Sequence, residues 1–122
     1  MTWTYSQSTG ILKHNGRFVA KGYAGKGIGT NNTKMENVPN IGPIPKGKYT
    51  LIELIQSHPT TGKYSIRLLP ASNNKMYGRS GFLIHGDSRK SSGTASSGCI
   101  ILKLVYRKQM WESNDRQLQV IE

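Results

Sequence analysis

Two short apolar runs, residues 82–84 and 100–102, constrain the fold of this chain more than any other feature of its sequence. Each run holds three apolar residues, and Gly81 and Gly98 lie just before them. Runs of this length with glycine at their borders fit buried β-strands and are too short for helices. We therefore predict two short buried strands, each beginning and ending close to a flexible loop.

His85 directly follows the first run, and Cys99, the only cysteine of the chain, directly precedes the second. Strand ends on a rigid scaffold commonly present catalytic side chains. If the two strands are neighbours, the imidazole comes within hydrogen-bond reach of the thiol, which needs such a base to become a nucleophile near neutral pH. Each residue alone is more often structural, but together they predict a Cys–His catalytic pair.

Gly98 and the loop before it supply further parts of the predicted site. A residue without a Cβ allows a sharp turn and the close approach of a substrate, so the amides of Gly98 and Cys99 are predicted to face the oxyanion of an acyl transfer. The loop 88–97 is too rich in serine and glycine to belong to the core. We expect Ser96 and Ser97 in this loop to contact the substrate.

Arg79 lies in the loop before the first apolar run. Its planar guanidinium suits a substrate carboxylate, which it can bind through two parallel hydrogen bonds. The alternative is an ordinary arginine on the surface, and both interpretations stay open at this point.

Turn residues and alternating patterns predict a mainly β fold. Asn15 and Gly16 supply the two positive-φ positions of a type I′ turn, which predicts a hairpin of residues 11–14 and 17–20. The other predicted elements are strands at 2–7, 49–55, 64–69 and 118–121, a loop at 22–29, a turn at 58–62 and one helix at 103–113.

The predicted helix groups four side chains roughly on one side, namely Leu104, Val105, Lys108 and Trp111. The remaining histidines, His14 and His58, fall in predicted turns, where we expect them to be solvated. Neither is therefore a candidate for catalysis.

Several motifs together resemble the L,D-transpeptidases, cysteine enzymes that remodel peptidoglycan stem peptides. The closer resemblance is to the small L,D-transpeptidase-like effectors exported by type VI secretion systems. It covers roughly residues 3–121. The segments that carry it are Ile84-His85-Gly86, Ser96-Ser97-Gly98-Cys99-Ile100, the proline- and glycine-rich residues 40–49, and Trp3-Thr4-Tyr5-Ser6-Gln7 with Thr9-Gly10.

The resemblance implies a β-sandwich with one short helix after the catalytic cysteine. It also implies that Cys99 attacks the carbonyl between the third and fourth stem residues, that His85 is the base, and that the Gly86 carbonyl orients the imidazole. The terminal D-alanine leaves, and water or an amine captures the thioester. The family's usual histidine two positions before the cysteine is Ser97 here, and the spacing between His85 and Cys99 is short, so trimming and cross-linking both stay open.

Length and charge narrow the classes of partner. With 122 residues the chain is predicted to form a single domain over residues 1–122. Its net charge of +11 favours polyanions such as the acidic cell wall. The basic residues never form a run longer than two, which argues against a dedicated nucleic-acid arm. The sequence lacks a long apolar segment and a metal-binding motif, so no membrane insertion, metal or cofactor is expected.

The beginning of the chain resembles no signal peptide. The resemblance accordingly implies export by a specialised secretion system into the periplasm of a target cell, with a cognate immunity protein and secretion components as partners and the effector as a monomer. Two other classes stay open. One is a non-catalytic basic module that binds cell wall or nucleic acid, and the other is a cysteine peptidase that acts on proteins.

Overall fold

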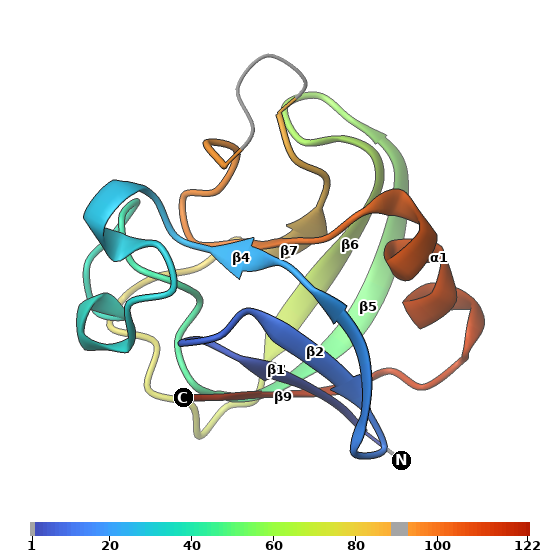
Figure 1. The fold of residues 1–122 in the computed structure, drawn as a ribbon, viewed down its shortest axis with the longest axis horizontal. Helices are drawn as coiled ribbons and strands as arrows, with labels where there is room; N and C mark the ends of the chain where they lie inside the picture. Colours follow the sequence, from blue (N-terminus) through green and yellow to red (C-terminus); the bar gives the residue numbers. More distant parts are fainter. Residues whose placement is uncertain (1, 89–92) are drawn as a thin grey trace.

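The computed structural model describes residues 2–88 and 93–122, and these form a mainly β fold with one α-helix (Figure 1). Part of the serine-rich loop that the sequence analysis singled out, residues 89–92, lies outside the described residues. The strands are β1 (Trp3–Ser6), β2 (Ile11–His14), β3 (Arg17–Lys21), β4 (Tyr23–Ala24), β5 (Gly47–His58), β6 (Gly62–Pro70), β7 (Leu83–His85), β8 (Ile100–Ile101) and β9 (Gln117–Ile121). The helix α1 is Leu104–Glu112, and two 3-10 turns are Gly27–Gly29 and Thr33–Met35.

The strands form one sheet in the order β3-β2-β1-β9-β5-β6-β7-β8-β4. Its two outermost strands, β3 and β4, are consecutive in the chain and are separated only by Gly22. The sheet therefore bends round until its ends meet, and its two halves face each other across the core (Figure 1). Gly22 is required at this joint because a Cβ there would collide with the carbonyl of Ile101. The predicted mainly β fold with one helix after the cysteine is confirmed.

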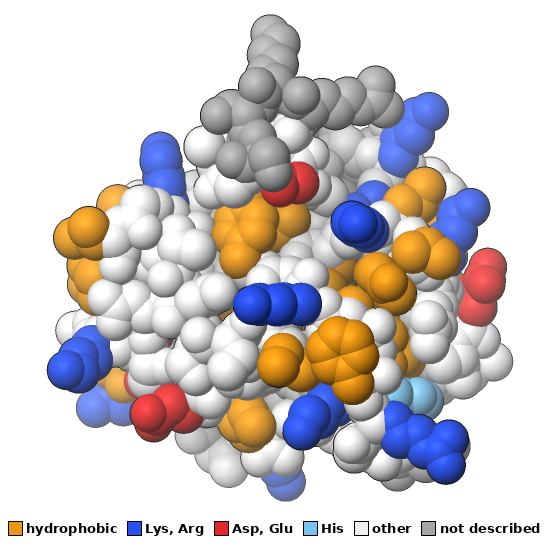
Figure 2. All heavy atoms as spheres, viewed as in Figure 1, with side chains coloured by type: hydrophobic (Ala, Val, Ile, Leu, Met, Phe, Trp, Pro, Cys, Tyr) orange, Lys and Arg blue, Asp and Glu red, His pale blue; other side chains and the backbone are white. Residues whose placement is uncertain are grey.

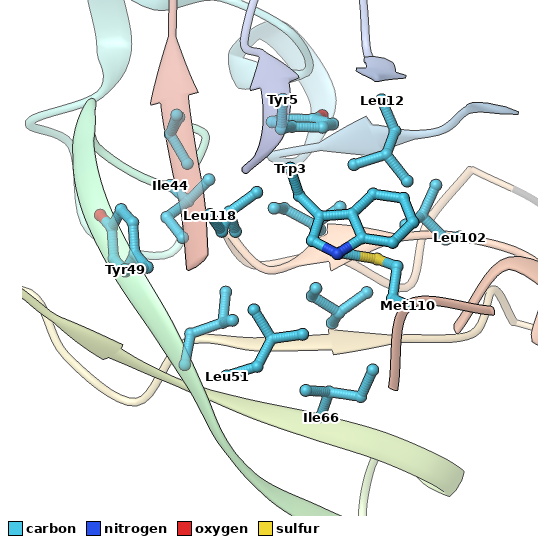
Figure 3. Packing of buried hydrophobic residues seen from close by; sticks show 14 of the residues in the cluster. Trp3, Tyr5, Leu12, Ile44, Tyr49, Leu51, Ile66, Leu102, Met110 and Leu118 are labelled. Atoms are coloured by element: carbon cyan, nitrogen blue, oxygen red, sulfur yellow. The ribbon is translucent and has the colours of Figure 1, made fainter. Parts of the chain in front are cut away.

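Alternating burial along the strands builds the core. In β1 the side chains of Trp3 and Tyr5 are fully buried, and in β9 those of Leu118 and Val120 are. This period of two is what a strand with one face on a core requires. Figure 3 shows that the inward side chains of β1, β5, β6 and β9 meet Met110 of α1 in a single cluster.

Local turn chemistry explains the hairpins. Asn15 and Gly16 have φ values of 51° and 82°, so the predicted turn between β2 and β3 is confirmed. The β5–β6 hairpin is longer at both ends than the sequence predicted. Its outer part follows a bulge between Leu51 and Glu53 and is largely exposed, so it lacks the apolar alternation by which strands are recognised.

The four side chains that the sequence analysis grouped on one side of the helix do not share one environment, because only Trp111 among them packs against the core cluster. Leu104 and Val105 are 43% and 61% exposed, and the buried side chains of α1 are Arg107 and Met110. Arg107 can be buried because its guanidinium donates hydrogen bonds to three main-chain carbonyls, which satisfy its polar groups.

Two further local predictions were incomplete. The segment 22–29 was expected to be a loop, but it contains β4, which pairs with β8, and a 3-10 turn. His14 was expected to be solvated, but its ring stacks on Trp3 with centroids 3.8 Å apart and its Nε2 lies 2.9 Å from the Asp115 carboxylate. The β4–β8 pairing and the contact between His14 and Asp115 join segments far apart in the sequence, so local patterns do not reveal them. Within residues 2–88 and 93–122 no helix has the length and apolar character needed to cross a membrane.

Candidate active site

Strands β7 and β8 are neighbours and pair in parallel, which meets the condition set in the sequence analysis that the two strands be adjacent. Ile84 lies opposite Ile100 in this pairing. Cys99 directly precedes β8, and its Sγ accepts a hydrogen bond of 3.3 Å from the Leu83 amide at the start of β7. The pairing therefore brings the thiol to the strand that ends in His85.

His85 and Cys99 line one cavity of about 470 Å³. Its other walls are small polar residues from two loops that lie at the same end of the molecule (Figure 1). Thr60 and Thr61 come from the β5–β6 turn, and the segments on either side of residues 89–92 provide the rest. The reactive pair thus faces a solvent-accessible space that can hold a polar substrate.

The His85 ring is held in a defined orientation. Its Nδ1 lies 2.9 Å from the carbonyl oxygen of Gly86, the residue that follows it. A carbonyl only accepts hydrogen bonds, so Nδ1 carries the proton and Nε2 is the basic nitrogen. The contact is the one that the family resemblance implies for Gly86.

Burial makes both members of the pair prefer their neutral forms. Desolvation lowers the pKa of His85, and the positive charge of Arg107 and the nearby His58 act in the same direction, against the Gly86 carbonyl. Desolvation raises the pKa of Cys99, although the Leu83 amide and Arg79 oppose this. Both shifts favour a neutral thiol and a neutral imidazole in the shared cavity.

Ser96 has a structural part in the site. It is buried, and its Oγ accepts hydrogen bonds from the amides of Gly25 and Gly98 at 2.9 and 3.0 Å and donates one of 2.6 Å to the Cys99 carbonyl. The sequence analysis assigned Ser96 to substrate contact, but its hydroxyl is committed to the loop that presents the cysteine. Ser97 is exposed and faces the cavity as expected.

The hydrogen bond between the Gly98 amide and the Ser96 hydroxyl contradicts the function expected for Gly98. Its amide donates to Ser96 and is not available for an oxyanion. The Cys99 amide belongs to the same residue as the sulfur, so it remains a candidate donor to an oxyanion. Gly98 is still required, because its φ of +134° is unfavourable for other residues and a Cβ would collide with Arg79.

Arg79 is neither an ordinary surface residue nor an open carboxylate clamp. It is 9% exposed, and its guanidinium donates to main-chain carbonyls of Glu36, Gly42, Pro43 and Ser97. It therefore joins the proline-rich segment 36–43 to the cysteine loop. Arg79 also lines a second cavity of about 350 Å³, which adjoins the first at Ser97 and Cys99.

Sequence reasoning missed two groups that position the site. Arg107 of α1 donates to the carbonyls of Lys63, Tyr64 and Leu102 and packs so closely on Gly86 that a Cβ there would lie 2.7 Å from its Nη1. A single arginine within a helical segment carries no local signal of this function.

The second missed group is a hydrogen-bonded bridge across the cysteine loop. Tyr23 of β4 donates a hydrogen bond of 2.7 Å to Asp87 and accepts one of 3.0 Å from the Ala95 amide. Asp87 also accepts from the amides of Ser88 and Gly93. These contacts join the two ends of the loop to β4. Among the described residues, no group of three His, Cys, Asp or Glu side chains is placed to hold a metal ion.

The comparisons with known proteins concern the fold and the family of the chain. A solved structure, L,D-transpeptidase 1 of Mycobacterium tuberculosis, is similar over 99% of this chain and 61% of its own, with a TM-score of 0.56 and 15% sequence identity. The chain therefore spans less than two thirds of that enzyme, and the likeness concerns the fold. No curated protein matches the chain in sequence.

A family model described as the Tlde1 domain matches residues 19–122. The match takes in β7, β8 and the loop between them, and thus His85 and Cys99. The chain belongs to the Tlde1 domain family, the type VI secretion L,D-transpeptidase effectors that its motifs resemble.

Proposed function

We propose that the chain acts on peptidoglycan tetrapeptide stems, where it removes or exchanges the terminal D-alanine through a thioester on Cys99. One observation carries the proposal, namely that an oriented, neutral His85 and the Cys99 thiol line the same polar cavity. Membership of a family of peptidoglycan-modifying effectors supports the choice of substrate.

The first half-reaction forms the thioester. His85 Nε2 takes the thiol proton, and Cys99 Sγ attacks the carbonyl carbon between the third and fourth stem residues. The Cys99 amide would donate a hydrogen bond to the oxyanion. The carbon–nitrogen bond then breaks, and the imidazolium returns its proton to the departing amine of D-alanine.

The second half-reaction releases the acyl group. Water or an amine attacks the thioester carbon while His85 takes a proton from it, and the proton passes to the leaving Cys99 sulfur. Water gives a trimmed tripeptide, and an amine gives an exchanged or cross-linked product. Both outcomes use the same residues.

The position of His85 distinguishes the two cavities at Cys99. Because His85 must protonate the departing amine and deprotonate its replacement, both groups belong in the cavity that His85 lines. The acyl part of the stem then extends into the cavity lined by Arg79 and Phe82, which His85 does not line.

The lowered pKa of His85 predicts the pH profile of kcat/KM. His85 acts as a base only when neutral, and its pKa lies below the ordinary value. Activity should therefore persist as the pH falls to about 6.5, the ordinary pKa of histidine, and decline only below it. A profile on tetrapeptide stems from pH 4 to pH 9 checks this, and an acid limb centred above pH 7 would contradict the neutral pair.

Purified muropeptides test the proposed function. Tetrapeptide muropeptides should lose their terminal alanine. With an added D-amino acid, that amino acid should take the place of the alanine. Both products are identified by their mass. Pentapeptide stems should be poor substrates. Denatured protein is the control, since its cleavage with muropeptides intact would identify a cysteine peptidase, and binding without any mass change would identify a wall-binding module.

The place of action follows from the same proposal. The family is one of secreted effectors, and tetrapeptide stems lie outside the cytoplasmic membrane. We place the activity in the periplasm of a target cell, with a cognate immunity protein as the natural antagonist.

A further inference from the structure

A groove extends from the active-site cavity toward α1. A cavity of about 370 Å³ shares Thr61, Gly86 and Asp87 with the active-site cavity, and a third of about 280 Å³ continues from it, sharing Gly86 and Asp87. We call these two further cavities the basic groove. It runs from the His85 side of the site to the joint between β3 and β4.

Three lysines line the basic groove, namely Lys63 near the active site, and Lys21 and Lys103 further along. All three are exposed, and none takes part in the ion pairs found among residues 2–88 and 93–122. The buried Arg107 adds positive charge beneath them. Basic side chains also lie on this face near β4 and α1 in Figure 2.

Asp87 is the only carboxylate among the described residues of the groove. Its oxygens accept hydrogen bonds from the Tyr23 hydroxyl and from the amides of Ser88 and Gly93. These donors lie where the groove meets the active-site cavity. The groove therefore presents the Asp87 carboxylate where it meets the active-site cavity, with Lys63 and Arg107 nearby and the exposed Lys21 and Lys103 further along.

We propose that the basic groove binds an acidic acceptor peptide whose amine captures the thioester. This inference rests on the proposed function, which places the incoming amine on the His85 side. An amine that enters beside Asp87 leaves the carboxylates of its peptide over the lysines, where opposite charges attract. A free D-amino acid carries its carboxylate next to its amine and so offers no further acidic group to the lysines of the groove.

The test compares two triple variants with the same loss of charge. The groove variant carries Lys21→Gln, Lys63→Gln and Lys103→Gln. The control variant carries Lys13→Gln, Lys34→Gln and Lys48→Gln, at exposed lysines that do not line the groove. The ligand is a synthetic stem tripeptide with a free side-chain amine, and a copy with its carboxylates amidated is the matched control.

Binding is measured by titration of the tripeptide into Cys99→Ala protein, so that no reaction intervenes. The groove variant should bind it about three- to tenfold more weakly, as expected for the loss of three exposed charge pairs. The control variant should match the parent, and the amidated peptide should be insensitive to the groove substitutions. Equal affinities in all three proteins, or equal losses in both variants, would overturn the proposal.

Turnover separates this inference from the proposed function. The groove variant with Cys99 intact should trim tetrapeptides at the parent rate and show a higher KM for the acceptor tripeptide alone. If the parent protein neither trims nor transfers, the proposed function fails, and the titration still decides whether the groove binds acidic peptides. An acidic protein that binds here while the tripeptide does not would also overturn the proposal.

Discussion

Cys99→Ala should lower kcat/KM on tetrapeptide stems by about 10⁴-fold or more, since without the sulfur no thioester forms and only binding contributions remain. Cys99 accepts one hydrogen bond, from Leu83, and is only partly buried, so the loss of stability should be about 1 kcal/mol. Muropeptide assays and thermal unfolding of the same preparations measure the two effects. Near-parent activity in the variant would end the assignment of Cys99 as nucleophile.

A growth comparison extends this result to cells. Four strains express the parent or Cys99→Ala, each with and without an added signal peptide that directs it to the periplasm. Only the periplasmic parent should impair growth, with swelling or poor division, because only it meets stem peptides with its chemistry intact. Harm from the periplasmic variant would point instead to binding by a basic protein of net charge +11.

His85→Ala should lower kcat on the order of 10²- to 10⁴-fold, the usual contribution of a positioned general base. His85 is 4% exposed, so His85→Gln is made beside it to keep the volume of the ring. Both variants should show this loss at neutral pH and retain the alkylation of Cys99 by a thiol reagent at high pH, where the thiol ionises without a base.

His58→Ala is the matched control for His85. His58 Nδ1 accepts hydrogen bonds from the amides of Thr60 and Thr61 in the β5–β6 turn, so its loss should alter the cavity wall and leave the proton transfer intact. We expect a change in KM with kcat close to the parent value. If His58 proves essential and His85 dispensable, the roles given to the two histidines are reversed.

The parts of the fold that rest on local rules could be predicted from the sequence. The β2–β3 hairpin follows from Asn15 and Gly16, and the strands that carry His85 and Cys99 follow from two apolar runs with glycine beside them. That His85 and Cys99 share a cavity could be anticipated only on the condition that the two strands are neighbours, and the structure meets that condition.

The supports of the site could not be predicted, since each joins segments far apart in the chain. Arg79 reaches carbonyls some forty positions away in the proline-rich segment, and Arg107 reaches Lys63 and Tyr64. Burial of an arginine is stable only where carbonyls converge on it, and this depends on the order of strands in the sheet. Ser96 likewise reaches the distant Gly25 amide, whereas its hydrogen bonds with Gly98 and Cys99 are local.

The joint at Gly22 has a consequence for how the molecule comes to be active. Strand β4 beyond it pairs with β8, so Ala24 has to meet Ile100 before the sheet is complete. Contacts of such sequence separation form late and slowly, and folds dominated by them take milliseconds to seconds to fold. The same end of the sheet supports the cysteine loop, because the Ser96 hydroxyl before Cys99 accepts a hydrogen bond from the Gly25 amide directly after β4. We therefore expect this loop to take its final form only in a chain whose sheet is closed at both β7 and β4.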